Sequence, residues 1–158
     1  MSNTTTPTDI YERLEQDHDK QRQLIDAVKA SAPGSAERTE LWTKLRNELE
    51  AHASAEEQAF YSKLMAEPEG TDDTRHAVEE HQEMHEMIAE LDAMANGAEV
   101  WTKLFGKLAH KVIHHVDEEE EEFFPDARET LTDAQEDKAL ETFEVRKKAE
   151  LQKQREDA

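Results

Sequence analysis

The chain has 158 residues, of which 35% are hydrophobic and 37% are charged, and its formal net charge is −20. That length is enough for one domain with a core of its own. The excess of negative charge argues against a nucleic-acid partner, because phosphate binding depends on Lys and Arg. The absence of cysteine excludes disulfides, thiolate metal sites and thiol nucleophiles.

No segment approaches the roughly 18 apolar residues that a membrane span needs. The first residues, 1–7, lack both the basic start and the apolar stretch of a secretion signal. We therefore expect a soluble, cytoplasmic protein that has no membrane partner.

Only four glycines and four prolines interrupt the chain, which predicts long helices. The first helix is expected over 7–30, with Thr6 as its N-cap, and the second over 35–66. The third is expected to begin at Thr71, whose hydroxyl would cap it, and to end at Asn96-Gly97.

The fourth helix is expected over 98–131, with a kink at Pro125, where a backbone hydrogen bond is lost. A capping box formed by Thr132 and Gln135 predicts a fifth, highly charged helix. Its few apolar residues would support packing along one edge at best, and its end is expected to fray. We therefore divide the chain into a bundle over 7–131 and a charged extension over 132–158, whose acidic tail could contact a protein partner.

An internal repeat relates residues 7–67 to residues 70–130. A shift of sixty-three residues preserves apolar character at many positions and superimposes three unusual polar pairs: His18 on His81, His52 on His115 and Glu56 on Glu119. A repeated helix pair that cannot bury its apolar face alone must pack against its twin. The sequence thus predicts an all-α, antiparallel, up-down-up-down four-helix bundle.

The inward stripe of each half contains a His and a Glu one turn apart, between apolar residues. A carboxylate buried in such a stripe costs several kcal/mol unless it meets a cation, gains hydrogen bonds or is protonated. Ordinary i,i+4 pairing of His52 with Glu56, and of His115 with Glu119, would contribute only about 0.5 kcal/mol. That alternative explains neither the repeat nor the further inward histidines.

Those further histidines are His18, His81 and His85, which follows His81 by one turn. The repeat partner of His85 is Arg22, so the predicted site is unequal, and its more open position lies beside His18 and His52. Five nitrogens and two carboxylates suit two ions with both glutamates bridging; such ligands favour iron, with manganese and zinc as alternatives. The other histidines, His76, His110 and His114, are expected at the surface or behind the ligands, and Glu57 and Glu120 as supports for ligands.

At this point the chain resembles the hemerythrin family, in its bacterial hemerythrin-like or HHE cation-binding form, over about residues 7–130. The motifs that carry the resemblance are Asp17-His18-Asp19, His52-Ala-Ser-Ala-Glu56-Glu57 with Phe60-Tyr61, Glu80-His81 with His85, and His114-His115-Val-Asp-Glu-Glu119 with Phe123-Phe124-Pro125. Together these motifs are specific, whereas any one alone would be weak.

The resemblance implies a non-haem di-iron centre with an oxo or hydroxo bridge, in which one iron is open to dioxygen or another small ligand. Its ligands would be His18, His52, His81, His85 and His115, bridged by Glu56 and Glu119. In oxygen-carrying members an Asp follows the His of the last helix in the pattern His-x4-Asp. In this chain Glu119 follows His115 by four residues and Glu120 follows it by five. The choice between Glu119 and Glu120 as the bridge, and a role purely as an oxygen carrier, are therefore left undecided.

Three functions are compatible with this site. The leading hypothesis is a di-iron protein that binds or senses dioxygen. The second is an enzyme that decomposes peroxide or reduces nitric oxide, although the sequence offers no dedicated general acid or redox cysteine. The third is a module that stores or senses iron, in which metal ligation stabilises the bundle.

Overall fold

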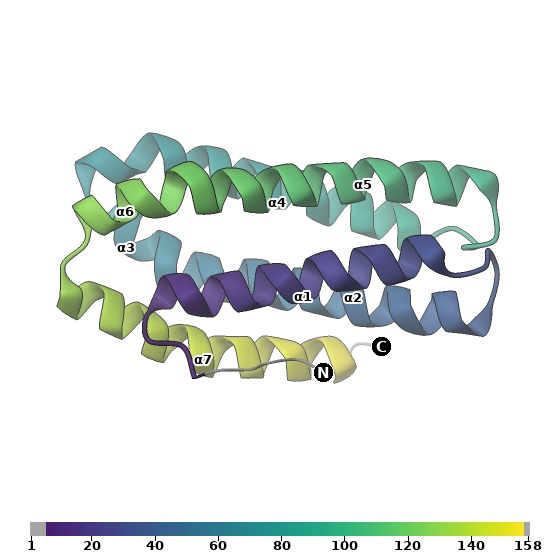
Figure 1. The fold of residues 1–158 in the computed structure, drawn as a ribbon, viewed down its shortest axis with the longest axis horizontal. Coiled ribbons are helices and arrows are strands. Elements are labelled where there is room, and N and C mark those ends of the chain that lie inside the picture. Colours follow the sequence, from purple (N-terminus) through teal and green to yellow (C-terminus); the bar gives the residue numbers. More distant parts are fainter. Residues whose placement is uncertain (1–5, 157–158) are drawn as a thin grey trace.

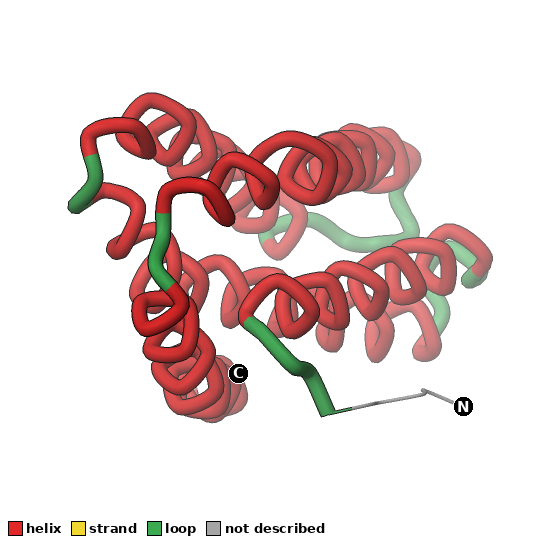
Figure 2. The backbone as a smooth tube through the Cα atoms, turned by 60° about the vertical axis from the view of Figure 1, so that its left-hand side comes forward, coloured by secondary structure: helices red, strands yellow, loops and turns green. Residues whose placement is uncertain are grey.

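Four antiparallel helical segments lie side by side, and a fifth helix runs along one side of them (Figures 1 and 2). The computed structural model describes residues 6–156. The segments are α1 (Ile10–Ala30); α2 (Ala36–Glu56) with η1 (Glu57–Tyr61) and α3 (Ser62–Met65); η2 (Pro68–Gly70) with α4 (Thr71–Asp92); α5 (Glu99–Glu118) with η3 (Glu119–Phe123) and α6 (Phe124–Thr130); and α7 (Asp133–Glu156). The predicted all-α, up-down-up-down bundle is confirmed.

Two predicted helix caps are wrong. Asp9, rather than Thr6, caps α1: its carboxylate accepts a hydrogen bond of 2.8 Å from the backbone N–H of Glu12. Thr71 lies inside α4, where its hydroxyl donates to the carbonyl oxygen of Glu67 at 3.2 Å and does not cap the helix. In each case the predicted cap is not the residue that directly precedes the helix: α1 begins at Ile10, and Thr71 is already the first residue of α4.

Two π-helical segments interrupt the long second and fourth segments. They begin within one residue of equivalent places in the repeat: Glu57–Tyr61 follows Glu56 directly, and Glu119–Phe123 starts at Glu119, the repeat partner of Glu56. The second of these ends just before Pro125, which lies in the first turn of α6, so the helix departs from regular α geometry next to the residue that lacks an N–H. Short π segments of this kind occur frequently at functional sites.

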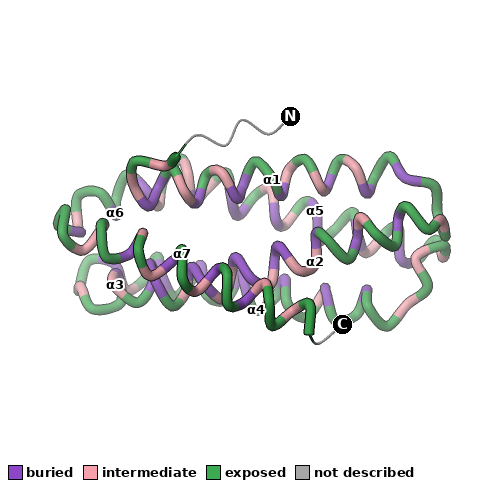
Figure 3. Tube along the Cα trace, turned by 90° about the horizontal axis from the view of Figure 1, so that it is seen from below, coloured by how far each residue is buried: buried purple, intermediate pink, exposed green. Residues whose placement is uncertain are grey.

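The buried apolar side chains form two clusters, one toward each end of the bundle. One cluster includes Tyr11, Phe60 and Phe124, and the other includes Trp42 and Trp101. Along each of the four helical segments, the candidate ligands lie near the place where one cluster gives way to the other. The buried stripe of each helix is visible in Figure 3. In the described part of the chain, no helix combines the length and apolar character needed to cross a membrane.

The two turns at one end of the bundle touch each other. Gly34, which adopts a positive φ of 75°, and Gly97 are separated by the same sixty-three residues as the polar pairs. A Cβ atom on Gly97 would lie 3.2 Å from the Cα of Gly34, so a side chain there would press on the facing backbone. Arg38 links the two turns at this end of the bundle by hydrogen bonds. Its guanidinium donates to the carbonyl oxygens of Ser31 and Asn96 at 2.8 and 3.3 Å.

The fifth helix, α7, is bound more firmly than the sequence predicts. Its capping box is confirmed: the N–H of Thr132 donates to Gln135 Oε1 at 2.8 Å, and the N–H of Gln135 donates to Thr132 Oγ1 at 3.1 Å. The helix lies against α2 and α1, and Phe143 is fully buried there. The helix packs along one edge, as expected, but this edge carries polar as well as apolar side chains, since Lys147 and Glu150 are buried beside Ala139 and Phe143.

The most consequential of these is Lys147, which is only 4% exposed. Its ammonium group donates to Asp17 Oδ2 and Glu48 Oε1, both at 2.7 Å. A charged residue so deeply buried is tolerated only because two carboxylates meet it.

Replacing this lysine should destabilise the protein strongly. We expect Lys147→Met to lower the free energy of unfolding by about 3–5 kcal/mol, because two buried carboxylates lose their cation. Lys138→Met, on the exposed face of the same helix, should change it by less than about 0.5 kcal/mol. Urea unfolding followed by circular dichroism would measure both, and equal effects would contradict the burial of Lys147.

Candidate metal centre

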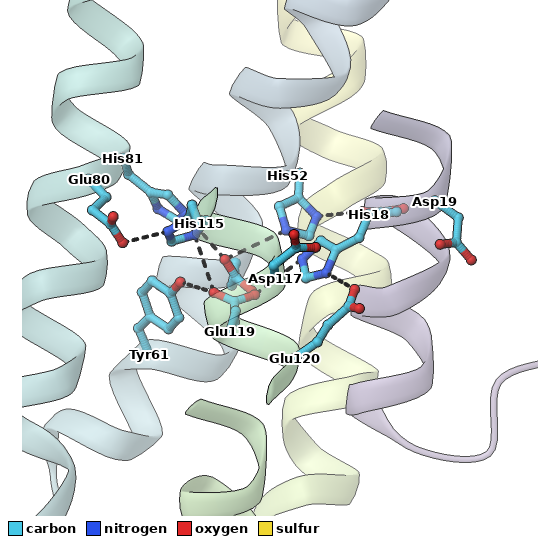
Figure 4. A network of polar contacts seen from close by, with 12 residues as sticks. His18, Asp19, His52, Tyr61, Glu80, His81, His115, Asp117, Glu119 and Glu120 are labelled. Atoms are coloured by element: carbon cyan, nitrogen blue, oxygen red, sulfur yellow. Dashed lines mark hydrogen bonds and ion pairs between the residues drawn. The ribbon is translucent and has the colours of Figure 1, made fainter. Parts of the chain in front are cut away.

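Six of the seven predicted ligands meet in the middle of the bundle. They form two groups whose nitrogen and oxygen atoms all lie within 4.8 Å of one another within each group: His18, His52, Glu56 and Glu119 form the first, and Glu56, His81 and His115 form the second. All six side chains are buried. Figure 4 shows the four imidazoles around the Glu119 carboxylate, with His18 and His52 on one side and His81 and His115 on the other.

Each carboxylate faces one histidine from each half of the repeat. Glu56 Oε1 lies 3.6 Å from His52 Nε2 and 3.3 Å from His81 Nε2. Glu119 Oε1 lies 3.2 Å from His18 Nε2, and its Oε2 lies 3.3 Å from His115 Nε2. Both glutamates are therefore placed to bridge two neighbouring ions.

Five atoms of this cluster have no hydrogen-bond partner among the described residues. They are His18 Nε2, His115 Nε2, both oxygens of Glu56, and Glu119 Oε1. Two of them, His18 Nε2 and Glu119 Oε1, lie 3.2 Å apart, and Glu56 Oε1 lies 3.6 Å from His52 Nε2, but these contacts lack hydrogen-bond geometry. Buried polar atoms are rarely left without a partner, and Nε2 nitrogens and carboxylate oxygens that converge in this way fit a metal cation.

A carboxylate supports each of the four imidazoles through its other nitrogen, Nδ1. His52 pairs with Asp17 at 2.7 Å and His115 with Glu80 at 2.8 Å, while the pairs His18 with Glu120 and His81 with Glu57 measure 2.7 and 2.9 Å. An Nδ1–H that donates to a carboxylate leaves Nε2 free to ligate and fixes the orientation of the ring.

These supports only partly follow from the sequence. Glu57 and Glu120 match in the repeat and were expected to play this part. Asp17 and Glu80 also match each other, but each precedes a candidate ligand on its own helix and supports a histidine on the neighbouring helix. Only the pairing of α1 with α2, and of α4 with α5, makes this visible.

The seventh predicted ligand, His85, is not brought to the centre. Its side chain is 58% exposed, and its Nδ1 lies 2.7 Å from Glu50 Oε2 at the surface. The cluster therefore contains four nitrogens rather than five, two on each side, and the predicted inequality between the two positions does not arise from His85. The other three histidines, His76, His110 and His114, are exposed as expected.

Tyr61 is the polar residue of the centre that sequence reasoning missed. Its hydroxyl donates a short hydrogen bond to Glu119 Oε2, and its ring stacks on His81 with centroids 5.3 Å apart. The repeat partner, Phe124, stacks on His18 at 6.0 Å and has no hydroxyl. Burial, together with the carboxylates of Glu119 and Glu56, raises the pKa of Tyr61 well above its usual value, so the phenol remains a donor.

An apolar cavity of about 30 Å³ adjoins the ligands. His52, His81 and His115 line it together with apolar side chains, and three further polar residues lie at its wall: Gln21, Glu50 and His85. A space of this size holds a water or a diatomic molecule.

The carboxylates of the cluster favour the protonated form of the imidazoles that face them. Burial alone would lower the pKa of His52, but Glu56 and Asp17 outweigh it and raise that pKa to about 10. Burial also opposes charge on His115, whose pKa is raised to about 10 by Glu119 and Glu80. Although burial acts in the opposite direction, the neighbouring Glu56 and the imidazoles of His115 and His18 keep the pKa of Glu119 well below its usual value.

The model of one known family matches this sequence over residues 9–127; its description is Hemerythrin HHE cation binding domain. The chain belongs to this hemerythrin-like family. Among solved structures, it is similar to a hemerythrin HHE cation-binding domain-containing protein from Mycobacterium kansasii, a homologue of Rv2633c. The TM-score is 0.82 at 23% identity, with 93% of this chain and 90% of that chain covered, which supports the fold. A comparison with curated proteins gave no significant match.

The metal-free hemerythrin-like bundle should lose stability in alkali. A histidine whose folded pKa is raised stabilises the fold below its unfolded pKa of about 6.5, and that contribution disappears as pH rises toward about 10. With a chelator present, urea unfolding should give a free energy lower by more than about 1 kcal/mol at pH 9.5 than at pH 6. A metal-free protein equally stable at both values would contradict the imidazolium assignment.

Proposed function

We propose that this hemerythrin-like protein holds two non-haem iron ions and binds dioxygen or a similarly small ligand at them. The observation that carries the proposal is the convergence of unpartnered ligand atoms on two groups that share Glu56. One ion would be held by His18 and His52 and the other by His81 and His115, with the two glutamates shared. Mixed imidazole and carboxylate ligation favours iron over softer metals.

The surrounding residues support a small, uncharged ligand. Two adjacent irons would supply electrons and open coordination positions. The apolar cavity beside His52, His81 and His115 would exclude bulky or charged molecules by its size and lining. The hydroxyl of Tyr61, directed at the centre from the His81 side, would provide a hydrogen bond near the bound ligand.

Tyr61 also favours peroxide turnover as a second function. The sequence alone offered no dedicated general acid, whereas in the structure the buried phenol of Tyr61 contacts the Glu119 carboxylate. A group in that position could stabilise one oxygen of a peroxide by hydrogen bonding.

Metal analysis tests the site itself. We expect two irons per chain in the purified protein, and one or none in His115→Ala, because each ion depends on only two imidazoles. His85→Ala and His110→Ala should retain two, since both side chains lie outside the cluster. Loss of iron in His85→Ala alone would restore His85 as a ligand, and full iron in His115→Ala would reject the proposed centre.

Optical spectroscopy distinguishes the two functions. On addition of dioxygen to the reduced, iron-loaded protein, we expect a visible absorption band that disappears when oxygen is removed. Oxidation without such a band, accompanied by steady turnover of hydrogen peroxide that falls at least about tenfold in Tyr61→Phe, would replace oxygen binding with the enzymatic function. Peroxide turnover no faster than that of free iron would exclude the enzyme.

A further inference from the structure

The carboxylates that support the four histidines differ in whether a Lys or Arg side chain pairs with them. On the side of His18 and His52, Asp17 pairs with Lys147 and Arg13, and Glu120 pairs with Arg22. On the other side, Glu80 and Glu57 have ion pairs with histidines only, among the described residues. The ligand set is twofold, but the charge around it is not.

The side of the centre that holds His18 and His52 is also covered by another helix. Helix α7 lies over α1 and α2, where Phe143 contacts the ring of His52 with centroids 5.8 Å apart. Lys147 fills the space behind Asp17. A cation approaching from this side would meet a fixed positive charge.

The other side opens into a pocket of about 100 Å³ between α4 and the α5, η3 and α6 segment. Four carboxylates line it at the surface: Asp73, Glu118, Glu122 and Asp126. His115 and Glu119 line its inner part, and the unpartnered atoms of the centre include His115 Nε2 and Glu119 Oε1. The pocket therefore extends from an acidic surface to two residues of the candidate centre.

A third group of possible metal-binding residues lies on this route, formed by His76, Glu80 and Glu118. His76 Nε2 is 3.6 Å from Glu80 Oε1 and 3.7 Å from Glu118 Oε1. The same Glu80 oxygen accepts the hydrogen bond from His115 Nδ1. One carboxylate thus joins the outer group to a candidate ligand of the inner one.

We propose that this acidic pocket is the entrance through which divalent cations reach the centre, and that His76, Glu80 and Glu118 hold the ion on its way in. The inference rests on the proposed metal-binding function. A cleft lined by charges of one sign concentrates ions of the opposite sign and raises their association rate by 10-fold or more. The same field would slow the approach of anions.

The rate of metal uptake tests the entrance, with Co²⁺ as an optical probe of the metal-free, full-length protein. Glu118→Gln/Glu122→Gln should take up Co²⁺ about tenfold more slowly at low salt and still reach the same final stoichiometry. Glu40→Gln/Glu90→Gln makes the same change in net charge at exposed positions outside the pocket. This control should stay within about twofold of the unmodified protein, and the difference should shrink as salt screens the pocket.

Single substitutions at exposed positions test whether slower uptake by the double variant is caused by a folding defect. His76→Ala should slow uptake several-fold, whereas His110→Ala should not. Equal rates for the pocket variants and their controls would overturn the entrance, as would a lower final stoichiometry reached at an unchanged rate. If the unmodified protein bound no Co²⁺ at its histidines, the proposed function itself would fail.

Discussion

The burial of two carboxylates at the centre of an apolar bundle is the constraint on which the rest of the structure depends. Glu56 and Glu119 are almost inaccessible to solvent, and each would cost several kcal/mol without positive charge nearby. The four imidazoles offset this cost when they are protonated, and we propose that they act as neutral ligands when a metal is bound. The supporting carboxylates stabilise either state, because Nδ1–H donates to them in both.

Much of this arrangement was predictable from the sequence, because helical periodicity is local. The repeat and the inward stripes predict the topology, and they bring His18, His52, His81 and His115 to one level with Glu56 and Glu119. The outer limits of the fourth segment agree with the prediction to within one residue. What periodicity specifies is the face of a helix on which a side chain lies.

Contacts between helices were harder to predict. His85 shares a face with His81, yet one turn further along α4 its ring pairs with Glu50 at the surface. Tyr61 matches an apolar residue in the repeat, and the π segment that contains it changes the register in a way that a regular period cannot reveal. Lys147 belongs to a helix whose charged sequence suggests exposure to solvent. Only its partners on α1 and α2 explain its burial.

The contact between Gly34 and Gly97 locates an axis of internal symmetry. The two glycines are equivalent in the repeat and touch each other, just as the equivalent Glu56 and Glu119 lie side by side within the histidine cluster. A line through both contacts runs along the bundle. A rotation of half a turn about this line would exchange one helical hairpin with the other. Each hairpin therefore presents a self-complementary surface to its twin, and the fold has the form of a homodimer of hairpins joined into one chain.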